Sequence, residues 1–145
     1  MSEPLFTPGR PVVIDTNCVL DLWVFQDPGA TGLLNAVTAG RLHWCATLVM
    51  REELARVLGY PQVERRLGGT SLSAQDVLAK FDAHAHIAPP PPTSTVRCRD
   101  ADDQVFIDLA VQHRAILVSK DARVIELARR LAPWGVAQVR PWPLI

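Results

Sequence analysis

The sequence predicts an α/β protein, a three-layer α/β/α sandwich around a central and mainly parallel sheet. Short apolar runs of strand length alternate along the chain with longer stretches whose apolar residues recur at helical spacing. Strands joined through helices pair in parallel because the connection has to cross the sheet, and the helices then cover both faces. The 145 residues are an ordinary length for one domain. We therefore expect a single domain over residues 1–145.

The N-terminal part predicts a strand followed by two helices. The apolar run Pro11–Ile14 ends at Asp15, and helical spacing of apolar residues follows over residues 17–25. Gly40 suits the end of a second helix over residues 30–39, because glycine adopts the left-handed conformation without strain. This order of strand, sharp turn and helix opens the predicted sheet.

A second strand is expected over residues 42–46. Thr47 is a suitable N-terminal cap for a third helix that reaches about Leu58. A further short helix is expected over residues 61–67, before a pair of glycines.

The middle of the chain is expected to be helical and to end at a run of prolines. Ser73 and Asp76 have the spacing of a capping box, which predicts a helix that reaches about His86. Residues 89–92 are four prolines, which lack backbone N–H donors, so they predict a stiff surface connection. The remaining chain predicts a helix, a strand, a helix and a strand over residues 102–113, 115–118, 122–131 and 136–139.

The charge balance argues against a strongly basic protein. Lys plus Arg and Asp plus Glu number 15 each, so the formal net charge is zero, and any polynucleotide must be bound by a local group of side chains. No apolar run approaches the roughly 18 residues of a membrane span, and the first residues lack the features of a signal peptide. We expect a cytoplasmic protein with no membrane association.

Two acidic residues follow predicted strands. Asp15 ends the first strand, and Asp121 comes shortly after the strand over residues 115–118. Ligands collect at the carboxyl ends of the strands in an open α/β sheet, so both acids are expected at one edge. Two carboxylates beside one crevice repel each other unless a cation lies between them. Because no histidine motif accompanies them, the acids favour a hard ion, Mg²⁺ or Mn²⁺.

Two further acids lie on predicted helices that can lean over the same edge. Glu53 lies at the border of a core face that includes Leu54, whereas Glu52 points more outward. Asp103 stands in the first turn of its helix, where an acid suits the helix dipole. Each could instead be a helix cap or a solvated surface charge, and the residues alone leave these alternatives open.

Four segments resemble the successive motifs of the PIN-domain family and occur in its order. They are residues 12–17, 53–58, 100–110 and 116–121. More narrowly, the chain is similar to the VapC-like toxins of toxin-antitoxin systems. The resemblance implies a PIN-like fold and a metal-dependent endoribonuclease that hydrolyses phosphodiester bonds of single-stranded RNA.

The resemblance also implies the residues of the site. The metal-binding and catalytic acids would be Asp15, Glu53, Asp103 and Asp121. Asn17 and Ser119 would give polar support, with Asp102 as an accessory acid. Asp103 stands seven residues before Ala110, which matches the spacing of the family. Gln104 departs from the pattern, since near relatives often have Lys there, and this puts one phosphate contact in doubt.

The implied chemistry is hydrolysis assisted by one or two Mg²⁺ or Mn²⁺ ions. Such ions align a water for in-line attack, lower its pKa and neutralise charge on the leaving oxygen. The implied partners are a cognate antitoxin and a second copy of the chain in a homodimer. The basic residues nearest to the acids are the candidates for binding RNA phosphates, namely Lys120, Arg51, Arg99 and Arg97.

Two other functions compete with this interpretation. Phosphatases of the haloacid-dehalogenase type also end their first strand on Asp, but they need a second Asp two residues later, where this chain has Asn17. The stronger alternative is a catalytically silent PIN-fold binding module, or an RNA-processing subunit that acts through partner contacts. Intact acids at all four positions favour the nuclease.

Overall fold

A five-stranded parallel sheet forms the centre of the molecule. The computed structural model describes residues 9–140, and the sheet has the strand order β3-β2-β1-β4-β5. The strands are β1 Pro11–Ile14, β2 His43–Ala46, β3 His86–Ile87, β4 Ile116–Val118 and β5 Ala137–Val139. All four pairings are parallel. β1 and β4 lie in the middle and are almost wholly buried, as strands covered on both faces must be.

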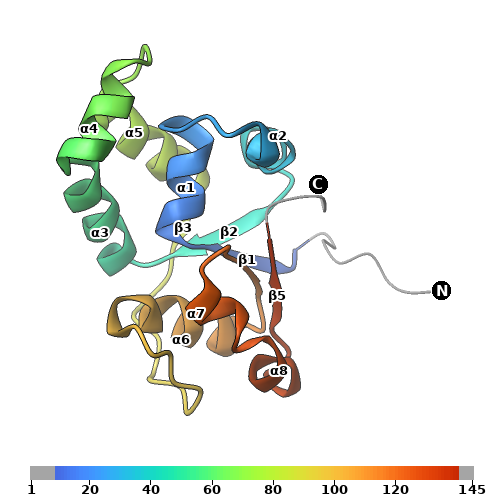
Figure 1. Ribbon diagram of the computed structural model, residues 1–145. Helices are drawn as coiled ribbons and strands as arrows, with labels where there is room; N and C mark the ends of the chain where they lie inside the picture. The colour runs from blue at the N-terminus through green and yellow to red at the C-terminus, as the bar shows by residue number, and fades with distance from the viewer. Residues whose placement is uncertain (1–8, 141–145) are drawn as a thin grey trace.

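Helices cover both faces of this sheet. One face carries α1 Thr16–Trp23, α2 Thr31–Thr38, α3 Leu48–Leu58, α4 Pro61–Gly68 and α5 Ala74–His84, and the other carries α6 Gln104–His113, α7 Ala122–Ile125 and α8 Ala128–Leu131 (Figure 1). The chain reaches β3 through the first set and β5 through the second. Right-handed crossovers in opposite directions place their helices on opposite faces. The predicted three-layer α/β/α architecture is confirmed.

Local capping chemistry sets the predicted helix starts. The Thr47 hydroxyl accepts a hydrogen bond from the Met50 N–H at 3.2 Å, and α3 begins directly after it. Ser73 and Asp76 form the reciprocal capping box of α5, with bonds of 3.1 and 2.8 Å. Gly40 follows α2 with a φ of +70°. These boundaries follow from residues within one turn, which is why sequence alone predicts them.

The structure corrects three predicted elements. The helix predicted over residues 73–86 ends at His84, and the next two residues pair with β2 as the edge strand β3. An exposed strand of two residues leaves no periodic signal. The helix predicted over 122–131 is broken into α7 and α8, because the Leu127 N–H bonds only three residues back, to the Val124 carbonyl. The helix predicted over 102–113 begins with a separate 3-10 turn, Ala101–Asp103.

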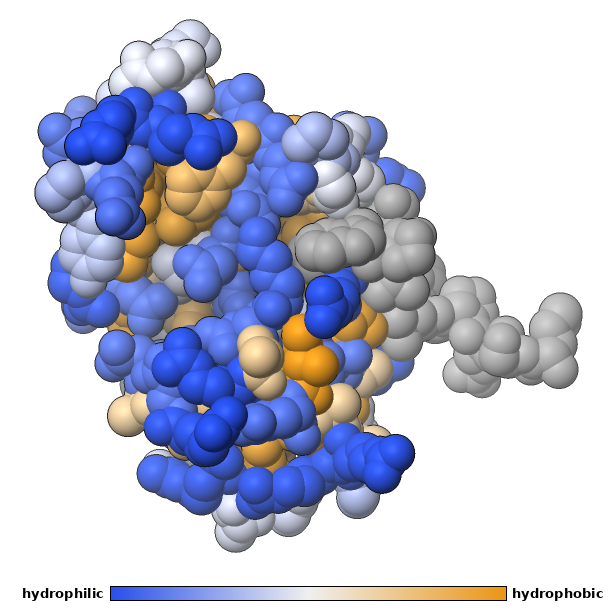
Figure 2. Space-filling model, viewed as in Figure 1, coloured by the Kyte–Doolittle hydropathy of each residue, from blue (hydrophilic) through white to orange (hydrophobic). Residues whose placement is uncertain are grey.

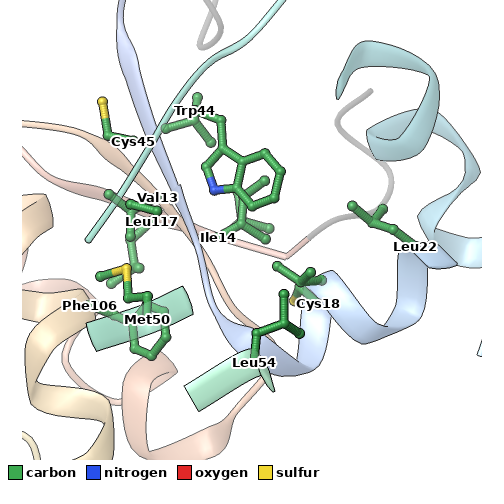
Figure 3. Close-up of a cluster of buried hydrophobic side chains, with 14 of the residues drawn as sticks. Val13, Ile14, Cys18, Leu22, Trp44, Cys45, Met50, Leu54, Phe106 and Leu117 are labelled. Carbon is green, nitrogen blue, oxygen red and sulfur yellow. The ribbon is translucent and has the colours of Figure 1, made fainter. Parts of the chain in front are cut away.

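One continuous set of buried hydrophobic residues fills the space between the sheet and the helices on both of its faces. Trp44 of β2 is 1% exposed and packs edge-on against Phe81 of α5, with ring centroids 5.1 Å apart. Figure 3 shows Trp44 close to Ile14 and the side chains of Met50 and Phe106 gathered near the carboxyl end of the strands. This core fixes where β1, α3 and α6 meet. Within residues 9–140 no helix is long and apolar enough to cross a membrane.

Candidate functional site

The carboxyl ends of the two central strands bring Asp15 and Ser119 together. β1 and β4 are in register at Ile14 and Val118, and the Asp15 N–H donates to the Val118 carbonyl at 3.1 Å. The Ser119 hydroxyl donates to Asp15 Oδ2. Residues 104 positions apart in the sequence therefore meet, because parallel strands end at the same edge of a sheet.

Asp15 is a buried carboxylate whose two oxygens are both hydrogen-bonded. The residue is 4% exposed, and its Oδ1 accepts from the Cys18 N–H at 2.9 Å, which caps α1. Burial raises the pKa of Asp15 and outweighs the hydrogen bonds from Ser119 and Cys18, which lower it, while the charge of Asp121 raises it further. The charged form of Asp15 would be stabilised by a cation at this edge.

Ser119 connects two of the four predicted acids. Its side chain is fully buried, and its hydroxyl accepts from the Asp121 N–H at 3.1 Å while it donates to Asp15. The Gln138 side chain in β5 donates to the Ser119 carbonyl at 2.8 Å. Ser119 is therefore held from three directions and orients the Asp15 carboxylate.

Glu53 reaches the same edge from α3. Its Oε1 accepts a short hydrogen bond from the Thr16 hydroxyl in the first turn of α1. Burial raises the pKa of Glu53, against the lowering effect of the Thr16 bond and of the Arg56 charge, and Asp102 and Asp15 raise it further. Sequence reasoning did not single out Thr16. Its position next to an acid was visible, but its partner lies 37 residues away.

Asp103 and Asp102 have different surroundings. Burial raises the pKa of Asp103 to about 7, and neighbouring carboxylates, Asp121 foremost, add to this shift. Asp103 Oδ2 is buried and has no hydrogen-bond partner among the described residues. Asp102 is exposed, and its charge acts on Glu53 instead. The structure thus places Asp103 within the group of acids and Asp102 at its rim.

Asp121 is the N-cap of α7, and its carboxylate forms an ion pair with Arg123. Its Oδ1 accepts from the Arg123 N–H at 2.8 Å and from the guanidinium at 3.4 Å. Burial raises the pKa of Asp121, but the hydrogen bonds and charge of Arg123 outweigh it and hold the pKa below its usual value. Arg123 also pairs with Asp100 at 3.1 Å. Sequence reasoning missed Arg123, because only tertiary structure brings Asp100 next to it.

The remaining predicted residues lie outside this group of acids. Asn17 is exposed on α1. Three of the cations suggested for phosphate binding already form ion pairs: Arg51 with Asp82, Arg99 with Glu126, and Lys120 with the buried Asp21. A substrate phosphate would have to compete with a carboxylate for each of them. Their predicted role therefore gains no support from these contacts.

Gln104, which stands where near relatives often have Lys, forms hydrogen bonds to the loop before α6. Its Oε1 accepts from the Cys98 N–H at 2.7 Å, and its Nε2 donates to the Val96 carbonyl and to Asp108 Oδ1, both at 2.9 Å. A lysine could not accept the bond from Cys98. The glutamine thus fixes the loop that leads to Asp103, rather than presenting a polar group to solvent.

Comparison with known families gives the site its context. The family model of the PIN domain matches residues 11–123. The chain belongs to the PIN-domain family. A search of curated proteins finds no match. PIN domains are in general nucleases that act on RNA, and they typically use divalent metal ions, so membership indicates a phosphodiester hydrolase.

The acids of this PIN domain have the donor chemistry that Mg²⁺ and Mn²⁺ require. All four offer carboxylate oxygens, three have a raised pKa, and Asp103 Oδ2 is buried without a hydrogen-bond partner between residues 9 and 140. Among the described residues, no three such side chains already stand close enough to hold one ion. Asp15 and Glu53 are turned toward Ser119 and Thr16 instead.

Proposed function

We propose that this protein is a Mg²⁺- or Mn²⁺-dependent endoribonuclease that hydrolyses phosphodiester bonds of single-stranded RNA. One observation carries the proposal: four carboxylates, from the end of β1, from α3, and from the starts of α6 and α7, lie close enough at one edge of the sheet to act on one another's charge. Burial and mutual repulsion raise the pKa of three of them, in Asp103 to about 7. A group of acids that disfavours its own charge is most simply explained as a cation site.

The proposed roles of the acids follow from what surrounds each one. Asp15, held by Ser119 and Cys18, is the fixed ligand. Asp103, whose buried Oδ2 accepts no hydrogen bond from the part of the chain that the structure describes, is the acid best prepared to bind an ion. Glu53 and Asp121 approach from opposite sides. A bound Mg²⁺ or Mn²⁺ would neutralise charge on the scissile phosphate and lower the pKa of the attacking water. One or two ions are compatible with four acids.

We further propose that the chain is the toxin of a toxin-antitoxin pair, inhibited by a cognate antitoxin and assembled as a homodimer. This proposal rests on the sequence resemblance to VapC-like toxins. It includes the expectation that residues 1–145 form a single domain. Growth arrest of bacteria that express the wild-type chain, and none with Asp15→Asn, is the expected result. Equal growth of both strains would contradict the toxin role and leave RNA processing as the alternative.

The decisive experiment is cleavage of mixed-sequence RNA with Mn²⁺ or with a chelator. Asp15→Asn removes the charge yet keeps an acceptor for the Cys18 N–H, so α1 stays capped. We expect metal-dependent cleavage by the wild type, reduced at least about 100-fold in the variant, since metal-assisted charge stabilisation amounts to several kcal/mol.

Asp27→Asn is the matched control for this cleavage experiment. Asp27 also caps a helical turn, accepting from the Gly29 N–H at 2.9 Å, and it is not one of the four acids proposed to bind metal. The control should cleave like the wild type. Folded wild-type protein that cleaves no RNA with either metal would refute the nuclease and favour the silent binding module.

A further inference from the structure

The helix that carries Glu53, together with the turn that follows it, presents two more residues suited to RNA beside the acids. Glu53 and Arg56 are three positions apart, which places them on one side of α3. Tyr60 follows the end of α3 at Leu58 as the N-cap of α4, and its side chain is hydrogen-bonded to Arg56. α3 begins near the sheet and runs away from it toward α4 (Figure 1). Arg56 therefore lies one turn beyond Glu53, and Tyr60 lies at the junction between α3 and α4.

Arg56 is a cation beside the acids that is free to bind a phosphate. It is exposed and forms no salt bridge with any residue between 9 and 140, in contrast to Arg51, Arg99 and Lys120. Its pKa is raised, first by a side-chain hydrogen bond to Tyr60 and also by the charges of Glu53 and Asp102. It therefore borders the Glu53 side of the group of acids.

Tyr60 adds an exposed aromatic surface next to this cation. It is 47% exposed and is the only tyrosine in the chain. Single-stranded nucleic acids are bound by cations that contact phosphates and by aromatic rings on which bases stack. A protein with zero net charge needs such a local arrangement, because its overall field does not attract RNA.

We propose that Arg56 and Tyr60 form a binding subsite for the single-stranded RNA next to the scissile phosphate, with Arg56 on a phosphate and Tyr60 stacked on a base. This rests on the proposed nuclease function and specifies where its substrate lies. The strand would then extend from the acids along α3, over a face that carries mostly hydrophilic side chains between α3 and α7 (Figure 2). Arg123, on the opposite side of the acids, is held by Asp100 and Asp121.

The test measures RNA binding without cleavage, by fluorescence anisotropy of a short labelled single-stranded RNA in chelator. Tyr60→Ala should weaken binding about fivefold or more, because stacking on an aromatic side chain is worth about 1–3 kcal/mol per base. Tyr60→Phe should bind like the wild type. Arg56→Gln should weaken binding and reduce the salt dependence by about 0.7 in the log-log slope, the value for one phosphate contact on a single strand.

An abasic strand of the same length separates the two roles. On this strand Tyr60→Ala should lose its effect, since no base remains to stack, whereas Arg56→Gln should still weaken binding. Trp134→Ala is the matched control: Trp134 is also 47% exposed, but the adjacent Gly135 carbonyl is bound by Arg10, just before β1 begins, at the opposite edge of the sheet. It should bind as the wild type does.

The outcomes distinguish this subsite from the nuclease itself. Equal binding by wild type, Tyr60→Ala and Arg56→Gln, all folded by circular dichroism, would refute the subsite even if Mn²⁺-dependent cleavage occurs. Weakened binding in both variants, with Trp134→Ala unchanged, would support it even if no RNA were cleaved. An effect of Tyr60→Ala that persists on the abasic strand would refute stacking.

Discussion

At the scale of single residues, hydroxyl groups orient the acids of this protein. Ser119 donates to Asp15, and Thr16 donates to Glu53, so each carboxylate has a fixed direction before any ion binds. Asp103 is the exception, since its buried Oδ2 has no partner among the described residues. The charged form of Asp103 is therefore destabilised in the folded chain. As a result, the free energy of unfolding should depend on the pH at which Asp103 titrates.

Asp103→Asn should change how stability depends on pH in chelator. The folded pKa of Asp103 is raised from 3.8 to about 7, so between these values the folded chain binds more protons than the unfolded chain, and stability falls as pH rises. The variant should lose this decline and exceed the wild type above pH 7. We expect the free energy of unfolding of the variant to exceed that of the wild type by only on the order of 1 kcal/mol, because solvent screens the charge of a half-buried group.

Urea denaturation at several pH values from 4 to 8 measures the effect of Asp103→Asn. Asp102→Asn is the control, since Asp102 is exposed and its neighbour in sequence. Parallel pH curves for wild type and Asp103→Asn would show that Asp103 titrates normally.

At the scale of elements, the loop before α6 decides where Asp103 lies. Gln104 binds this loop at Val96 and Cys98 and also reaches the buried Asp108, which itself accepts from the Ser94 N–H at 2.8 Å. These side-chain hydrogen bonds fix the start of α6 together with the apolar packing of Val96, Phe106 and Ile107. Loss of these hydrogen bonds should make both the loop and the position of Asp103 less well ordered.

Gln104→Met should destabilise the protein by about 1–3 kcal/mol, because the partly buried Cys98 N–H loses its acceptor while the volume of the side chain is nearly kept. Gln112→Met makes the same change at an exposed position of α6 and should stay within about 0.5 kcal/mol of the wild type. Chemical denaturation measures both. Equal stabilities would mean that the loop is held by other contacts.

At the scale of the whole molecule, the parallel sheet collects residues from four distant segments at one edge. Each acid is attached to an element whose core side is buried: β1 and β4 inside the sheet, α3 through Met50, Leu54 and Leu58, and α6 through Phe106 and Ile107. The acids repel one another at the end of a rigid scaffold. A divalent ion that binds them should therefore stabilise the fold as a whole.

Mn²⁺ should raise the free energy of unfolding of the wild type, by about 2.7 kcal/mol at a hundredfold excess over its dissociation constant. The free energy of unfolding of Asp15→Asn should rise far less when Mn²⁺ is added. The measurement is the urea midpoint with and without Mn²⁺, compared with KCl at the same ionic strength, which screens the acids without binding them. A shift reproduced by KCl would argue against a specific site.

Much of the fold was predictable because it depends on local signals. Capping residues such as Thr47 and Ser73 set the helix starts, and the alternation of strands and helices predicted the parallel three-layer sandwich, which is confirmed. The edge strand β3 and the break between α7 and α8 were not predictable. β3 depends on pairing with the distant β2, and the break arises where the Leu127 N–H bonds three residues back, so neither leaves a periodic pattern.

For the site, the sequence by itself determined which acids follow strands: Asp15 and Asp121 stand there whatever the details of packing. The family resemblance already favoured Asp103 over Asp102, but only the tertiary structure decided that Asp103 is partly buried while Asp102 is exposed, and that Arg51, Arg99 and Lys120 are held by carboxylates. The physical reason is the separation in sequence of the residues on which each feature depends. A strand end or a cap depends on a few adjacent residues, whereas a shared pKa shift or an ion pair depends on which distant segments the core brings into contact.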